Sequence, residues 1–205
     1  MEDGLSDTKA ASRLLPVVGA FVAGLALVLG GFIYFAAHSA SSIGSAVAAV
    51  GGPFHLEDQS GKPFSDQDMK GKPFLVFFGY THCPDICPTT LFEISEVMKA
   101  LGKDADRTGA LFITVDPERD TPAVLKDYMS NFDPHLRGLT GNRPAIDAAI
   151  KAYRVYAAKI PLKDGDYSMD HTAAVYLMNK DGHFVAPFNL KQTPEAAAKQ
   201  LRGYL

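Results

Sequence analysis

The pattern of hydrophobic positions sets one long apolar stretch apart from the rest of the chain. Residues 14–37 carry no charged side chain and are almost wholly apolar. A helix of this length can cross a hydrocarbon core of about 30 Å. The apolar region of a cleaved signal peptide is shorter, at about 7–15 residues. The pattern therefore predicts one uncleaved transmembrane helix near the N-terminus.

Residues 53–205 instead contain short apolar runs that alternate with amphipathic segments. The predicted elements are, in order, a hairpin at 53–72, a buried strand at 74–78, a helix from Cys83 onward, a buried strand at 110–115, a helix that starts at Thr121 and Pro122, a short edge strand at 136–139, a helix from Pro144, strands at 156–161 and 172–178, a return strand at 183–188 and a closing helix at 195–205. Strands that alternate with helices form sheets covered on both faces. The pattern predicts an α/β domain with a mixed sheet flanked by helices, preceded by the transmembrane helix.

The distribution of charge around the apolar stretch predicts its orientation. Lys9 and Arg13 precede it, and the next Lys or Arg is Lys62. Because Lys and Arg accumulate on the cytoplasmic side, residues 1–13 are predicted to be cytoplasmic and the remainder exported. Acidic side chains in this N-terminal segment disfavour a mitochondrial transit peptide.

Residues 38–52 are rich in Ser, Ala and Gly, which predicts a flexible linker to the domain at 53–205. The expected location is the inner membrane of a bacterium, with a single membrane pass and the domain in the periplasm. The 205-residue chain has a net charge of −3 and no basic stripe. Nucleic acid is therefore not an expected partner.

The only two cysteines, Cys83 and Cys87, lie where the predicted strand at 74–78 gives way to a helix. Unpaired N–H groups and the helix dipole favour a thiolate at such a position. The four-residue spacing would place both sulfurs on one helical face, where they can close a redox-active disulfide or hold a soft metal. Buried structural cysteines are the ordinary alternative. Pro84 and Asp85 are instead typical of an exposed helix start.

His171 precedes the predicted strand at 172–178 and is expected in a loop. A histidine in such a place usually has no special role, but two thiolates need a further ligand to hold a metal well. Two thiolates and one imidazole suit copper, as Cu(I) or Cu(II). His171 is therefore the candidate third ligand. His82, next to Cys83, and Asp170 are expected to be surface residues.

Three motifs together resemble one known family. They are Phe78-Gly-Tyr-Thr-His-Cys-Pro-Asp-Ile-Cys87-Pro, Val115-Asp-Pro-Glu-Arg-Asp-Thr-Pro122 and Asp170-His171-Thr. In combination, over about residues 53–205, they resemble the Sco/SenC family of copper chaperones.

The resemblance implies a thioredoxin-like fold and copper ligation by Cys83, Cys87 and His171. It also implies a role in maturing the dinuclear copper centre of cytochrome c oxidase, with the copper-accepting subunit and other periplasmic copper chaperones as partners. The second motif is a recurrent feature of this resemblance. From its charges alone, we expect residues 116–120 to form a solvated loop with a helix cap.

Two other functions fit a thiol pair at a helix start. A membrane-anchored thiol–disulfide oxidoreductase would use the two cysteines for exchange, but thioredoxins have a spacing one residue shorter and a proline where His171 is expected. A peroxidase of the peroxiredoxin type would need a better placed second cysteine. Metal binding is therefore the favoured function. Because thiols must be reduced to bind copper, oxidation to a disulfide would switch binding off.

Overall fold

The computed structural model describes residues 24–34, 50–163 and 165–205. Contacts divide the chain into two units, Met1–Ala48 and Ala49–Leu205. The buried hydrophobic core of the described residues lies entirely in the second unit. The predicted cytoplasmic segment at 1–13 lies outside the described residues, and so does the predicted linker apart from its last three residues.

Residues 24–34 are helical, and their large apolar side chains are exposed. They fall inside the predicted transmembrane segment, the remainder of which lies outside the described residues. Within the part of the chain that the structure describes, no helix combines the length and the apolar composition that a membrane crossing requires. The transmembrane helix stays a prediction.

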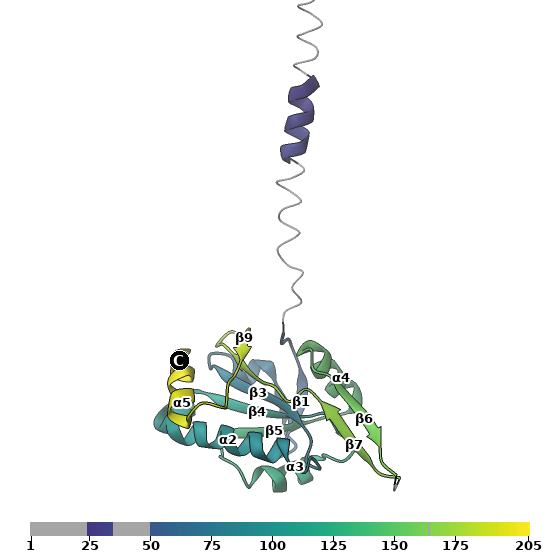
Figure 1. The fold of residues 1–205 in the computed structure, drawn as a ribbon, viewed down its shortest axis with the longest axis vertical. Helices are drawn as coiled ribbons and strands as arrows, with labels where there is room; N and C mark the ends of the chain where they lie inside the picture. The colour runs from purple at the N-terminus through teal and green to yellow at the C-terminus, as the bar shows by residue number, and fades with distance from the viewer. Residues whose placement is uncertain (1–23, 35–49, 164) are drawn as a thin grey trace, which may run out of the picture. The chain divides into compact units, whose positions relative to one another are not determined.

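The second unit is built on a seven-stranded mixed sheet (Figure 1). Its strands are β1 (His55–Asp58), β2 (Pro63–Ser65), β3 (Phe74–Gly79), β4 (Gly109–Thr114), β5 (Leu136–Thr140), β8 (Val175–Met178) and β9 (Phe184–Pro187), in the order β2-β1-β5-β4-β3-β8-β9. Strands β3, β4 and β5 are parallel, and the other pairs are antiparallel. The predicted mixed sheet is therefore confirmed, and so are the two predicted central strands.

Four helices surround the sheet: α2 (Ile86–Leu101), α3 (Pro122–Met129), α4 (Arg143–Ala152) and α5 (Pro194–Arg202). The last three start in the same way, with the side chain of Thr121, Asn142 or Thr193 accepting a hydrogen bond from the backbone N–H three residues on. A proline in the first turn supports each start. Two 3-10 segments, η1 (Asp66–Met69) and η2 (Gly102–Arg107), complete the connections.

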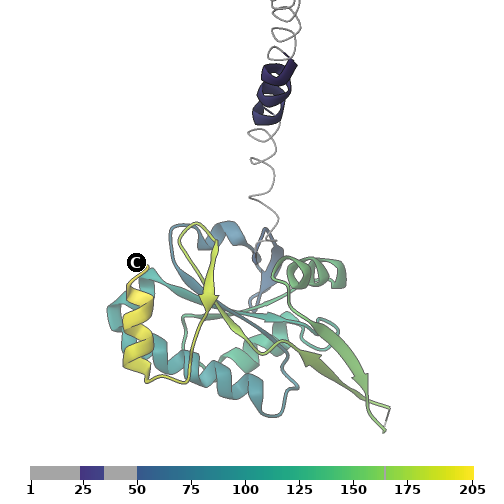
Figure 2. The same cartoon turned by 45° about the horizontal axis from the view of Figure 1, so that its top comes forward.

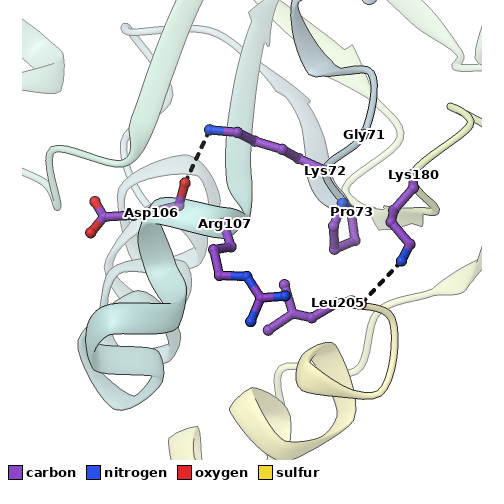
Figure 3. A pocket seen from close by; sticks show the side chains of 7 residues that line it. All are labelled: Gly71, Lys72, Pro73, Asp106, Arg107, Lys180 and Leu205. Atoms are coloured by element: carbon purple, nitrogen blue, oxygen red, sulfur yellow. Dashed lines mark hydrogen bonds between the residues drawn. The ribbon is translucent and has the colours of Figure 1, made fainter.

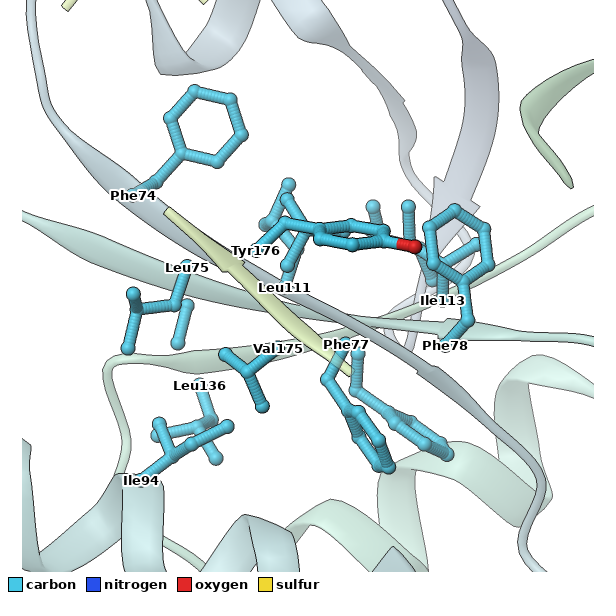
Figure 4. Packing of buried hydrophobic residues seen from close by; sticks show 14 of the residues in the cluster. Phe74, Leu75, Phe77, Phe78, Ile94, Leu111, Ile113, Leu136, Val175 and Tyr176 are labelled. Atoms are coloured by element: carbon cyan, nitrogen blue, oxygen red, sulfur yellow. The ribbon is translucent and has the colours of Figure 1, made fainter. Parts of the chain in front are cut away.

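The central strand β3 is buried along its whole length, and its side chains alternate between two layers (Figure 4). On one face the Phe78 ring lies 5.4 Å from the ring of Tyr153, which follows α4. On the other face Phe77 lies 6.1 Å from Phe112, on the side where Ile94 of α2 packs. Helices therefore cover both faces, as predicted.

The structure differs from the predicted elements in two places. The segment at 136–139 is an interior strand, because β1 returns antiparallel onto β5 with Glu57 opposite Thr140. The predicted strand at 172–178 is confirmed in shortened form as β8, which begins at Val175, but the strand before it was not predicted. That strand, β7 (Tyr167–His171), pairs with β6 (Ala157–Pro161) in a separate two-stranded ribbon that projects from the domain (Figure 2).

The two ends of the parallel strands differ in chemistry. At the amino end of β3, Lys72 Nζ donates to the backbone oxygen of Asp106 at 3.0 Å, and nearby Lys180 Nζ donates to the backbone oxygen of Leu205 at 3.0 Å (Figure 3). These lysines hold neighbouring chain segments together. The carboxyl ends of β3 and β4 lie at the opposite end, where open α/β sheets place their sites.

Candidate metal centre

All three predicted ligands meet at the carboxyl end of β3. Cys83 lies in the loop after this strand, Cys87 in the first turn of α2, and His171 is the last residue of β7. Their ligand atoms all lie within 4.8 Å of one another, and Cys87 Sγ is 3.5 Å from His171 Nε2. Among the described residues, no other set of three His, Cys, Asp or Glu side chains is grouped in this way.

The two cysteines do not share a helical face as predicted. Helix α2 begins at Ile86, so Cys83 precedes it by three residues. The Cys83 N–H donates to the backbone oxygen of Tyr80 at 3.3 Å, and Cys83 Sγ accepts from the Cys87 N–H at 3.4 Å. A turn therefore brings the sulfurs together, with Cys83 half-buried and Cys87 fully buried.

Gly79, which sequence reasoning did not single out, makes room for the buried sulfur. A Cβ atom at this position would lie 2.7 Å from Cys87 Sγ and 2.8 Å from Cε2 of Phe112. Both distances are far shorter than van der Waals contact. The sequence did contain a signal for this role. A glycine ends the apolar strand just before the cysteines, and glycine permits close approach of other atoms to the backbone.

The electrostatics of Cys87 differ from the prediction. Burial raises the pKa of its thiol, and this desolvation outweighs a backbone hydrogen bond from Tyr80 that acts in the opposite direction. Cys87 is therefore a protonated thiol at neutral pH, so the predicted thiolate-favouring effect of the helix start is wrong for this residue. A metal that binds Cys87 has to displace its proton.

His171 is oriented for ligation. Its Nδ1 lies 3.2 Å from the backbone oxygen of Thr172, which can only accept, so Nδ1 carries the proton and Nε2 presents a lone pair towards Cys87 Sγ. The ring packs edge-on against Phe77 at 6.2 Å and Tyr80 at 5.8 Å. His171 closes a strand instead of lying in a loop, which is a second difference from the prediction.

Two carboxylates of the loop after β4 are buried, which corrects the prediction that the whole loop is solvated, although Glu118 between them is exposed. Asp116 and Asp120 are both fully inaccessible. Asp120 accepts hydrogen bonds from the Thr81 hydroxyl at 2.6 Å, the Thr81 N–H at 3.1 Å and the Thr114 hydroxyl. Burial raises the pKa of Asp120, although these hydrogen bonds oppose the shift. The carboxylate joins the cysteine loop to the end of β4.

The same loop also holds the ribbon that carries His171. Asp116 accepts a hydrogen bond from the Tyr167 hydroxyl at 2.9 Å and pairs with Arg119. The Arg119 guanidinium stacks on the Tyr167 ring at 3.8 Å and donates to the Tyr167 backbone oxygen at 3.0 Å. Residues 116–120 therefore connect the cysteine loop and the ribbon, the two segments that carry the predicted ligands.

The remaining candidates lie outside the group. His82 is exposed, and its Nδ1 lies 3.1 Å from the Thr81 hydroxyl. Asp170 is exposed as well. Both positions agree with the predicted surface roles. Two sulfurs and one imidazole nitrogen form a soft donor set that suits copper, and the Nε2 lone pair beside a buried sulfur fits such an ion.

Comparisons with known proteins support this assignment. The SCO1/SenC family model matches residues 44–205. A SCO2-like protein of Rickettsia felis is 39% identical over 156 residues, which cover 75% of this chain and 76% of the relative. The structure of Bradyrhizobium japonicum ScoI with copper bound is 66% identical, with a TM-score of 0.75 over 77% of this chain and 100% of that chain. The structure of yeast Sco1 with copper bound is 40% identical, with a TM-score of 0.69, and the match covers 76% of this chain and 88% of that chain.

The sheet and its flanking helices are the thioredoxin-like fold of these Sco structures. Copper is the ion present in both solved relatives, and it is the ion that the donor set of this chain suits. The match of the family model and the identity to relatives cover most of the chain. The chain belongs to the SCO1/SenC family.

Proposed function

We propose that this protein is a membrane-anchored copper metallochaperone that binds copper through Cys83, Cys87 and His171. The observation that carries the proposal is the convergence of two sulfurs and one imidazole nitrogen within 4.8 Å. The Sco family is described as a family of cytochrome c oxidase assembly proteins. The expected acceptor is therefore the dinuclear copper centre of that enzyme.

The unequal burial of the two cysteines supports a delivery role. Copper is the cargo, and it has to enter and leave. Cys83 is half-buried beside exposed Pro84 and Asp85, while Cys87 is enclosed. An incoming thiol of the acceptor can therefore replace Cys83 first, while Cys87 and His171 still hold the ion. Each thiolate that leaves copper takes up a proton again.

The proposed location places residues 1–13 in the cytoplasm, residues 14–37 in the inner membrane and the domain in the periplasm. The helix at 24–34 and the absence of charge from the apolar stretch support this arrangement. The copper-accepting subunit and other periplasmic copper chaperones are the proposed partners.

Copper titration of the reduced domain tests the proposal. The fragment Ala49–Leu205 is suitable because it contains the whole described core. We expect one copper ion per chain, and binding in His171→Ala weaker by at least about 10–100-fold, because the loss of a mere partner of a metal ligand already costs that much. His183→Ala is the matched control, because His183 is an exposed histidine on the loop before β9. Unchanged binding in His171→Ala would remove this residue from the site.

Thiol–disulfide exchange is the second candidate, and the proximity of two free thiols favours it. In this function Cys83 and Cys87 would reduce cysteines of the acceptor before copper arrives, and the pair would become a disulfide. The reduction potential and the rate of exchange with a dithiol substrate measure this activity. A potential near the oxidising end, with rapid turnover, would favour exchange over copper delivery.

A further inference from the structure

Tyr80 lies at the centre of the site without being one of its ligands. It directly follows Gly79 and is almost fully buried, with 3% of its surface exposed. Its backbone oxygen accepts from the Cys83 N–H at 3.3 Å. The main chain of Tyr80 therefore contacts the loop that carries the first cysteine.

The side chain of Tyr80 contacts the third ligand. Its ring meets the His171 ring edge-on, with centroids 5.8 Å apart and planes at 89°. Its hydroxyl lies 3.0 Å from the hydroxyl of Ser168, in the strand that ends at His171. One side chain thus touches both the imidazole and the strand that carries it.

The ribbon needs such tethers because β6 and β7 pair only with each other in the described structure. The loop at 116–120 holds the ribbon at Tyr167, through Asp116 and Arg119. Tyr80 holds it one residue closer to His171. Of these tethers, Tyr80 is the one whose ring also packs against the imidazole.

We infer that Tyr80 is a positioning residue, which fixes the His171 imidazole against the two sulfurs through its ring and its hydrogen bond to Ser168. This inference rests on the proposed function, because it assumes that His171 binds copper. An ordinary core tyrosine would stabilise the fold without any specific effect on His171. The two roles predict different behaviour once His171 is removed.

Affinity measurements in two backgrounds separate these roles. Tyr80→Phe keeps the ring and removes the hydroxyl, and Ser168→Ala removes its partner. We expect each variant to bind Cu(I) about tenfold more weakly in competition with a chelator, as for loss of an outer-shell partner, and the double variant to bind no more weakly than either. In the His171→Ala background, Tyr80→Phe should have no effect on affinity. Additive losses of affinity in the double variant would overturn the inference. An equal loss caused by Tyr80→Phe in the His171→Ala background would overturn it as well.

Tyr176→Phe is the matched control, because Tyr176 is a buried tyrosine that stacks on Tyr153 and meets Phe184 edge-on. It should leave copper affinity unchanged. A loss as large as that of Tyr80→Phe would show a general effect of core tyrosines and would overturn the inference.

Nitrogen NMR of His171 in the copper-free protein gives an independent readout. The wild type should show a single tautomer with the proton on Nδ1, and Tyr80→Phe should show a mixture of both tautomers. An unchanged single tautomer in Tyr80→Phe would overturn the inference while leaving the proposed function intact. Failure of the wild type to bind copper through His171 would instead overturn the proposed function.

Discussion

At the residue scale, the sulfur of Cys87 lies against strand β3 only because residue 79 has no side chain. We expect Gly79→Ala to force Cys87 Sγ or the Phe112 ring aside, because an added Cβ would lie 2.7 and 2.8 Å from them. Overpacking of this kind costs about 1–3 kcal/mol, so the free energy of unfolding in urea should fall by that amount. Copper affinity should fall too, because a ligand moves.

Gly52→Ala is the control for this substitution. Its added Cβ would meet only the Cβ of Ala152, at 3.3 Å. A variant at residue 79 that is as stable as this control, with unchanged copper affinity, would contradict the role given to Gly79.

A second residue-scale prediction concerns pH and His135. Partial burial disfavours its charged form, but hydrogen bonds to Asp133 at 2.7 Å and Asp106 at 3.1 Å outweigh this and raise the pKa of His135. A histidine with a raised pKa stabilises the fold fully below its unfolded pKa of about 6.5, and this contribution disappears as the pH rises through the folded pKa.

Urea unfolding at about pH 6 and about pH 8.5 measures this contribution. The free energy of unfolding should fall more over this interval in the wild type than in His135→Gln. An identical fall in both proteins would show that the cluster around His135 contributes nothing that depends on its charge.

At the scale of elements, the ribbon of β6 and β7 decides whether the third ligand reaches the sulfurs. Tyr167→Phe removes the hydrogen bond to Asp116 and leaves the ring that stacks on Arg119. We expect faster amide hydrogen exchange in residues 157–171 and no change in β3 or β4, because a local tether is lost while the core is kept. Tyr156→Phe, at an exposed tyrosine, is the control. Faster exchange throughout the sheet would contradict a local role.

The elements also show which parts of the fold the sequence could predict. The apolar run of β3 and the helix start at Thr121 report local preferences, and the structure confirms them. Strand β7 has only one fully buried residue, Met169, so no alternating pattern marked it. The three proposed ligands could be named from their motifs, but their convergence depends on pairing between distant segments.

The burial of two carboxylates in the loop at 116–120 escaped prediction for a related reason. Charged residues are mostly exposed, so Asp116 and Asp120 were expected in water. Their burial is possible because they accept hydrogen bonds from Thr81, Thr114, Arg119 and Tyr167, and two of these donors, Thr81 and Tyr167, come from distant segments. Sequence spacing does not reveal such partners.

At the scale of the whole molecule, the chain combines a domain that holds the site with an N-terminal segment that we propose anchors it. Deletion of residues 1–37 should release the protein from the membrane into the soluble periplasmic fraction when an export signal is supplied. The copper affinity of the released protein should equal that of the full-length protein, because the site lies wholly in Ala49–Leu205. Continued sedimentation with membranes after the deletion would contradict the proposed anchor.

The most direct test of copper binding by two sulfurs and one imidazole is X-ray absorption spectroscopy of the copper-loaded, reduced domain. The wild type should show two sulfur ligands and one histidine nitrogen, and His171→Ala should lose the nitrogen while keeping both sulfurs. Identical spectra for the two proteins, or a wild-type spectrum without sulfur, would contradict the account.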